Sequence, residues 1–278
     1  MNEAAVVLVL GASGPVGRCF LERTRDQRIR AIAVSRRVPE QSWPHVTWLQ
    51  HDLEREPADV RTGSLVSFGP LAHALTQVEQ GRGLGRVIAL SSASTQFKRR
   101  SPDRAERRQM AAMLECEKAL KNACRERDIV LTLLKPTMIY GDGSDGNVSR
   151  IGGLVRRLPF VPVAGRGLRA PVHADDLARL TVECLIAGAD SAGTWLLAGG
   201  EVLTYPEMVR RIAAAEGRSV RLLRLPSWLT KPAVRAARLT GRLKDVSPAM
   251  IDRQAMDLVV DDTPAREQLG WDPRPFRP

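Results

Sequence analysis

Short apolar runs alternate with amphipathic stretches along the first half of the chain. Apolar runs of strand length occupy residues 6–10, 29–35, 46–50, 63–67, 86–91 and 130–134, and helix-like stretches lie at 18–25, 71–80 and 104–127. Strands that alternate with helices of this length predict an α/β fold with a parallel sheet and helices on both of its faces.

The pattern becomes less regular after residue 140. Glycine and aspartate at 141–148 predict a loop, helices are expected at 154–157, 175–187 and 205–216, and a short strand is expected at 195–198. The last helix begins at a capping box that runs from Thr204 to Glu207. We predict that residues 1–140 form a sheet domain. Residues 141–278 are expected to supply the remaining elements of that domain, interleaved with a small lobe.

Composition limits the class and the location of the protein. A length of 278 residues and a hydrophobic content of 44% suffice for a full α/β core. No apolar run approaches a membrane span, and the first residues lack the pattern of a signal peptide, which predicts a cytoplasmic protein. The four cysteines are scattered without metal-ligand spacing, so we expect reduced thiols and no metal site.

The chain is strongly basic, with a formal charge of +11 that comes mostly from arginine. The arginines are spread among acidic residues, and aromatic residues make up only 4% of the chain. This pattern favours a solvated basic surface over a nucleic-acid-binding face. Residues 228–243 have an apolar side and an arginine-rich side, and Pro232 within them favours burial against the small lobe over a helix on a membrane surface.

The first apolar run leads directly into a glycine-rich turn, VVLVLGASGPVG at 6–17, and then into a helix-like stretch. Gly11 would permit the tight turn, Gly14 would let the backbone approach a phosphate, and Gly17 would let the helix pack on the strand. The helix N-terminus then offers free N–H groups and a positive dipole end to an anion. This order of elements favours a dinucleotide pyrophosphate site over a turn that binds nothing.

Several motifs follow one another along the chain: GASGPVG at 11–17, HDL at 51–53, LSSAST at 90–95, LLKPTMIYGDG at 133–143, RAPVHADDLA at 169–178 and DDTPAREQLGWDPRPF at 261–276. In this order they resemble the extended short-chain dehydrogenases/reductases, a group that includes nucleotide-sugar epimerases, dehydratases and related reductases. The resemblance implies a Rossmann-type doubly wound parallel sheet with a small interleaved C-terminal lobe, in which residues 1–140 form the NAD(P)-binding domain.

The resemblance also implies which residues meet the cofactor. It assigns the pyrophosphate to Gly11, Ser13, Gly14, Pro15, Val16 and Gly17, the adenine to Asp52 and Leu53, and the nicotinamide carboxamide to Pro136, Thr137 and Met138. After the fourth strand, the backbone of Ser67, Phe68 and Gly69 would line the cofactor.

The end of the second strand bears on the choice between NAD and NADP. It carries Ser35, Arg36 and Arg37 where NAD enzymes usually have an acid. No carboxylate is present to repel a 2′-phosphate, and a hydroxyl and two guanidinium groups can bind one through charge-assisted hydrogen bonds. This favours NADP over NAD, and over two arginines that simply face solvent.

The catalytic set of the family is incomplete in this chain. The family uses a serine or threonine, a tyrosine, and a lysine that also binds the cofactor ribose; the resemblance assigns Ser92 to the serine and Lys118 to the lysine. The YxxxK spacing then puts Leu114 in place of the tyrosine. Tyr140 and Tyr205 are the only tyrosines, and both lie in other segments.

Two hypotheses from different classes follow. The first is an NADP-dependent oxidoreductase or epimerase-like enzyme for a nucleotide sugar or a carbonyl compound, in which Arg169 would bind a substrate diphosphate. The second is a non-catalytic NAD(P)H-binding sensor or assembly protein, which Leu114 favours. We favour the enzyme, because hydride transfer needs only a placed nicotinamide and substrate, and general acid help adds about 10²–10⁴-fold. The resemblance also suggests a homodimer that pairs through the helix carrying Lys118.

Overall fold

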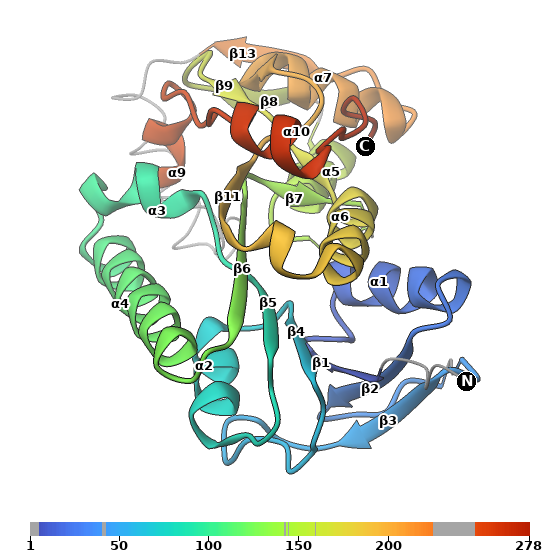
Figure 1. Ribbon diagram of the computed structural model, residues 1–278. Coiled ribbons are helices and arrows are strands. Elements are labelled where there is room, and N and C mark those ends of the chain that lie inside the picture. The colour runs from blue at the N-terminus through green and yellow to red at the C-terminus, as the bar shows by residue number, and fades with distance from the viewer. Residues whose placement is uncertain (1–5, 41–42, 142, 144, 159, 225–247) are drawn as a thin grey trace.

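The protein is described by a computed structural model that covers residues 6–40, 43–141, 143, 145–158, 160–224 and 248–278 (Figure 1). The segment 228–243, for which burial against the small lobe was expected, lies outside the described residues. No helix in the described ranges is long and apolar enough to cross a membrane.

A seven-stranded parallel sheet forms the centre of the larger lobe, in the order β11-β6-β5-β4-β1-β2-β3. Its strands are β1 (Val6–Leu10), β2 (Arg30–Ser35), β3 (Val46–Gln50), β4 (Ser64–Ser67), β5 (Arg86–Leu90), β6 (Val130–Pro136) and β11 (Gly193–Leu197). The strand order reverses between β1 and β4, so the sheet is doubly wound. This confirms the predicted fold class.

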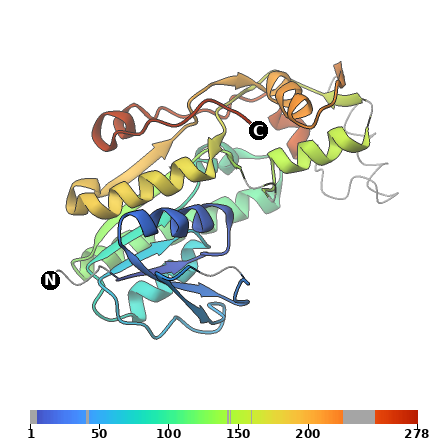
Figure 2. The same cartoon turned by 90° about the vertical axis from the view of Figure 1, so that its right-hand side faces the viewer.

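Helices cover both faces of the sheet. Helices α1 (Pro15–Asp26) and α6 (Ala174–Ala187) pack side by side on one face, as Figure 2 shows, over a core that includes Val9, Phe20 and Leu177. Helices α2 (Leu71–Gln80) and α4 (Arg104–Glu126) cover the other face over Leu8 and Leu120. The inner strands β1, β4, β5 and β6 are largely buried on both sides, which explains their nearly continuous apolar sequences.

The smaller lobe lies beyond the carboxyl ends of the strands (Figure 1). It contains α5 (Val148–Arg157), α7 (Tyr205–Ala215), α9 (Pro248–Arg253), α10 (Thr263–Leu269) and the paired short strands β7 (Ile139–Tyr140) with β10 (Val172–His173), β9 (Leu168–Arg169) with β12 (Leu203–Thr204), and β8 (Phe160–Val163) with β13 (Arg221–Arg224). Its core includes Val155, Met208 and Phe276.

Element boundaries agree closely with the pattern in the first half of the chain. Helix α2 spans the predicted residues, and α7 begins at the predicted N-cap, where the Thr204 side chain accepts from the Glu207 amide at 3.3 Å. The Glu207 carboxylate accepts from Arg210 and Arg211, so only this half of the capping box is observed. The helix predicted at 154–157 begins earlier, at Val148. The Asp145 carboxylate accepts from the amides of residues 147–149 and thereby caps this earlier start.

Candidate functional site

A cavity of about 530 Å³ lies between the carboxyl edge of the sheet and the smaller lobe. One end is lined by residues 14–17 and Phe68, and the middle by Ser91, Ser92 and residues 136–139. The far end is lined by α5, Tyr205 and α9, among other residues. Ligands of open α/β sheets bind at this edge, where the strand order reverses.

The glycine-rich turn lies at the first end of the cavity. Gly11 has a φ of +68°, and a Cβ there would lie 2.5 Å from the Gly69 nitrogen. A Cβ at Gly17 would lie 2.5 Å from the Gly11 carbonyl oxygen. The turn therefore requires glycine at both positions, for the two reasons that the sequence indicated.

The N-terminus of α1 is free to bind an anion. Gly14 is its N-cap, no side chain caps the first turn, and no acidic residue lies in that turn. The chain thus leaves unsatisfied N–H groups and the positive end of the helix dipole beside Gly14 and Val16, which both line the cavity. These features fit the pyrophosphate of a dinucleotide.

The end of β4 adds a further polar group beside the turn. Ser67 is buried, and its hydroxyl has no hydrogen-bond partner among the described residues. Phe68 packs against Phe20 of α1, with ring centroids 5.3 Å apart, and lines the cavity, while the Gly69 backbone lies against Gly11.

Two exposed arginines follow the end of β2. The Ser35 hydroxyl donates to the Arg37 carbonyl oxygen at 2.7 Å, which fixes a tight bend after the strand. Arg36 and Arg37 are exposed, and neither guanidinium has a partner among the residues that the structure describes. On the neighbouring strand end, the half-buried Asp52 accepts from the Glu54 amide at 3.2 Å.

Helix α4 turns a different face toward the sheet from the one that the motif spacing indicated. Its buried positions include Met110, Glu117 and Leu120, whereas Lys118 and Leu114 are exposed, Leu114 by 37%. Neither residue lines the cavity. The expectation that Lys118 would face the cofactor is therefore not supported, because the residue that α4 turns toward the sheet is Glu117, one position before Lys118.

Glu117 occupies the inward position instead and forms a buried ion pair. Its carboxylate accepts from the Lys135 ammonium at 2.8 Å, and both side chains are almost completely buried. The Ser91 hydroxyl, at the cavity wall, donates to the same carboxylate. Sequence reasoning missed Lys135, although a lysine within the apolar strand β6 is itself a signal, because a buried charge needs a partner.

Thr137 and Arg169 line the cavity, and both side chains bind backbone carbonyl groups. The Thr137 hydroxyl donates to the Ala170 carbonyl oxygen. The Arg169 guanidinium donates to the carbonyl oxygens of Leu168, Met256 and Arg253 and lies 5.4 Å from the centre of the Tyr205 ring. Burial lowers the pKa of Arg169 to about 10. Its observed role is to hold the segment after α9 at the cavity wall.

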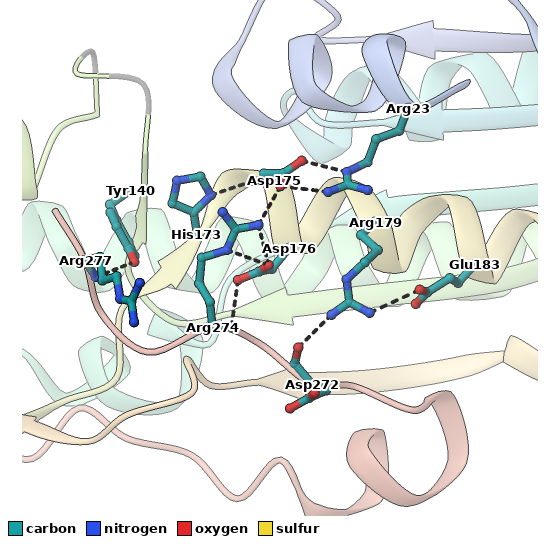
Figure 3. Close-up of polar contacts among 10 residues, drawn as sticks. All are labelled: Arg23, Tyr140, His173, Asp175, Asp176, Arg179, Glu183, Asp272, Arg274 and Arg277. Atoms are coloured by element: carbon teal, nitrogen blue, oxygen red, sulfur yellow. Dashed lines mark hydrogen bonds and ion pairs between the residues drawn. The ribbon is translucent and has the colours of Figure 1, made fainter. Parts of the chain in front are cut away.

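Ion pairs and hydrogen bonds connect α1, α6 and the segment around Arg274 (Figure 3). Asp175, in the first turn of α6, binds Arg23 of α1 at 2.6 Å and 2.7 Å, and Arg274 binds both Asp175 and Asp176. The Arg277 amide donates to the Tyr140 hydroxyl at 3.1 Å. The segment around Arg274 is thereby held against α6.

The expected site residues thus divide into two groups. The cavity is lined by Gly14, Pro15, Val16, Gly17, Phe68, Ser92, Pro136, Thr137, Met138 and Arg169, and it is not lined by Gly11, Ser13, Ser35, Arg36, Arg37, Asp52, Leu53, Ser67, Gly69 or Lys118. Cavity residues that the motifs did not indicate include Phe97, Lys98, Arg150 and Arg253. Within the described part of the chain, no cluster of His, Cys, Asp and Glu could hold a metal ion.

Comparisons with known proteins agree with the motif resemblance. No family model matches the chain. A UDP-glucose 4-epimerase of Vibrio cholerae is 29% identical over 162 residues, which cover 57% of this chain and 47% of that protein. The match thus spans about half the length of this relative.

Solved structures share the fold over nearly the whole chain. A UDP-glucuronic acid 4-epimerase from Bacillus cereus, described in complex with NAD, has a TM-score of 0.71 at 13% identity and covers 98% of this chain and 94% of its own. The terminal R domain of the myxalamid biosynthetic pathway has a TM-score of 0.72 at 16% identity and covers 97% and 86%. The similarity to epimerases and the Rossmann-type fold that the motifs indicated are both confirmed.

Proposed function

We propose that this protein binds NADP(H) along the carboxyl edge of its sheet and oxidises or reduces a carbon–oxygen bond of a substrate held in the cavity. The observation that carries this proposal is the continuity of that cavity. Its wall runs from the first turn of α1, past Ser92 at the end of β5, to Tyr205 and α9 of the smaller lobe. A dinucleotide and a substrate would meet in its middle.

Each part of the wall has a defined task in this proposal. The first turn of α1 would hold the pyrophosphate, and Phe68 and residues 136–138 would flank the nicotinamide. The Ser92 hydroxyl would donate a hydrogen bond to the substrate oxygen. When bound, the cofactor would supply or accept the hydride. The smaller lobe would close the site against water, which strengthens electrostatic interactions inside it.

The proposed preference for NADP rests on Arg36 and Arg37. Their guanidinium groups are exposed and without partners in the described residues, at the strand end where the adenosine ribose of a Rossmann fold lies. The related epimerase from Bacillus cereus is described with NAD, so the preference is a property to be measured on this chain.

A nucleotide sugar or a carbonyl compound is the proposed substrate. Support comes from the relatives, since the matched sequence is a UDP-glucose 4-epimerase and the structural neighbours include UDP-sugar 4-epimerases. Arg169, the residue expected to bind a substrate diphosphate, already donates to three carbonyl oxygens. A diphosphate would therefore have to displace these bonds or bind elsewhere in the smaller lobe.

Calorimetric titration with NADPH and NADH tests the binding half of the proposal, and an assay of nicotinamide absorbance with UDP-sugars, aldehydes and ketones tests the catalytic half. An epimerase needs a separate assay of sugar configuration, because its cofactor is regenerated in each turnover. We expect binding of NADPH and turnover of at least one substrate. Failure to bind either dinucleotide would overturn the proposal.

A non-catalytic NAD(P)H-binding protein is the second candidate. The observation that favours it is that two positions of the expected catalytic set lie outside the cavity. Lys118 and Leu114 face away from the cavity, and Tyr205, the tyrosine that lines it, lies beneath Arg169 in the smaller lobe. Tight binding of NADPH without turnover of any substrate would support this candidate.

A further inference from the structure

Lys98 is a cavity residue that none of the motifs accounts for. It begins the 3₁₀ turn Lys98–Arg100, between the short helix α3 (Ser94–Phe97) and α4, and its half-buried side chain lines the cavity. The same segment brings Ser92 and Ser94 to the wall. Lys98 therefore lies on the same segment of the cavity wall as Ser92 and Ser94.

The ammonium group of Lys98 has no hydrogen-bond or ion-pair partner among the described residues. Glu106 of α4 is the carboxylate that attracts the Lys98 ammonium electrostatically, but it is hydrogen-bonded to other residues. Glu106 accepts from Arg253 of α9 with both oxygens at 2.6 Å, and from the Ser101 hydroxyl at 2.7 Å. Burial and the nearby Arg253 lower the pKa of Lys98, and Glu106 opposes this shift only in part.

The other described ionisable groups of the cavity wall are poor proton donors. Asp145 is saturated, because its carboxylate accepts from three amides and from the Ser149 hydroxyl. Arg169 donates to three backbone carbonyl oxygens, and Arg253 binds the Glu106 carboxylate. Even with its pKa lowered to about 10, Arg169 stays protonated at neutral pH. Burial raises the pKa of Tyr205, so this phenol holds its proton more tightly than a free tyrosine. Lys98 remains as the group that can exchange a proton.

We propose that Lys98 is the proton donor of this cavity. The inference rests on the proposed function. In the reductive direction, the carbonyl carbon would receive the hydride that a bound dihydronicotinamide would supply, and the π-electron pair would move to the oxygen. That oxygen takes a proton from the Lys98 ammonium, and the neutral amine then regains a proton from water. In the oxidative direction the neutral amine accepts the hydroxyl proton. The group thus does the work that a phenol would do.

Lysine reactivity tests the proposal without any turnover. The protein is labelled with acetic anhydride over a pH series, and the modification of each lysine is quantified by mass spectrometry. Lys121, exposed on α4, is the internal reference. We expect Lys98 to become reactive at a lower pH than Lys121, and substrate to protect it from the reagent.

Variants then test the role in catalysis. Lys98→Met should lower kcat by about 10²–10⁴-fold, with little change in the Kd for NADPH, and Lys121→Met should leave both unchanged. Lys98→Arg keeps the charge but cannot give up its proton, so its kcat should stay as low as that of Lys98→Met. The alkaline limb of the kcat profile for reduction should follow the pKa obtained from labelling.

Three results would overturn the assignment. The first is equal titration of Lys98 and Lys121, and the second is a Lys98→Met variant with wild-type kcat. The third is full rescue of kcat by Lys98→Arg, which would make the residue an anion-binding group. A wild-type protein that binds NADPH without turning over any substrate would instead refute the proposed enzyme, and the proton donor with it.

Discussion

Arg36 and Arg37 place two positive charges, unpaired among the described residues, at the end of β2, where the proposed function would place a 2′-phosphate. We predict that Arg36→Ala weakens NADPH binding about ten- to a hundredfold and leaves NADH binding nearly unchanged. A charge-assisted hydrogen bond contributes about 1.5–3 kcal/mol, and each 1.4 kcal/mol is about a factor of ten. Titration calorimetry measures both affinities.

Arg30→Ala is the matched control for this measurement, since Arg30 is exposed at the opposite end of the same strand. It should change neither affinity. If wild-type protein binds the two dinucleotides equally well, Arg36 and Arg37 are only solvated surface charges.

Gly14 tests the phosphate turn. Its φ of −76° suits any residue, and an added Cβ would lie 3.3 Å from the Gly11 carbonyl oxygen. We predict that Gly14→Val folds but loses dinucleotide binding, because the branched side chain fills the volume beside the first turn of α1. Circular dichroism reports the fold and calorimetry the binding.

Gly63→Val serves as the reference for the general effect of a branched residue, because an added Cβ at Gly63 meets no atom within 4 Å. It should bind NADPH like the wild type. Unchanged affinity in folded Gly14→Val would mean that the glycines of the turn serve backbone packing alone.

At the scale of elements, the contact between α4 and β6 depends on the Glu117–Lys135 ion pair. Removing one partner leaves an uncompensated buried charge, so Lys135→Met should lower the free energy of unfolding by about 3–5 kcal/mol. The double variant Glu117→Leu/Lys135→Met should be more stable than the single variant, because apolar residues of similar size replace a buried pair at little net cost. Urea denaturation measures each value.

With the second single variant, Glu117→Leu, these form a double-mutant cycle that separates a structural pair from two independent contacts. Additive losses in the double variant would show that the two residues do not stabilise the contact as a pair. Glu117→Gln retains a group that can accept from Ser91. Its free energy of unfolding should therefore lie between those of the wild type and Lys135→Met.

Helix α4 also shows which features of the fold can be predicted from the sequence and which cannot. Apolar spacing predicted its length almost to the residue, but a motif spacing, and not burial, assigned its inward face. The choice between Glu117 and Lys118 depends on the partner across the interface, Lys135, which lies 18 residues further along the chain. The spacing of apolar residues within α4 cannot identify a partner on another element.

The short strands of the smaller lobe show a second limit. Pairs such as β9 with β12 have two residues each, too few for an alternation to appear. In this pair Leu203 lies opposite Arg169 in antiparallel register, so the partner strand is supplied by a segment that is distant in sequence. The first six strands of the sheet were predictable, since each contains a short apolar run, and the inner strands β1, β4, β5 and β6 are largely buried.

At the scale of the whole molecule, Asp175 connects α1, α6 and the segment around Arg274. Hydrogen bonding from Arg23 lowers the pKa of Asp175 from 3.8 to about 2. The unfolded chain therefore binds a proton at Asp175 more readily than the folded one. The stabilisation that the ionised Asp175 gives to the folded state is present in full above about pH 4. It is lost as the pH falls from about 4 toward 2.

We predict that Asp175→Asn removes this part of the acid sensitivity. Denaturation midpoints of wild type and variant should differ most above pH 4 and converge toward pH 2. Asp59→Asn, at an exposed aspartate, is the control and should follow the wild type throughout. A constant difference at every pH would mean that the ion pair with Arg23 does not shift the carboxyl group.

The segment that carries Trp271, Arg274 and Arg277 also constrains the order of events during synthesis. The Trp271 indole donates to the Ala198 carbonyl oxygen at 2.9 Å, and the Arg277 amide reaches Tyr140. A ribosome releases these residues after every element that they bind. Until then, the nascent chain exposes the apolar surfaces that Trp271 and Phe276 later cover, and it is open to aggregation and chaperone binding. Chains arrested before residue 271 should therefore be cut by protease within the smaller lobe, whereas β1 to β5 should already resist.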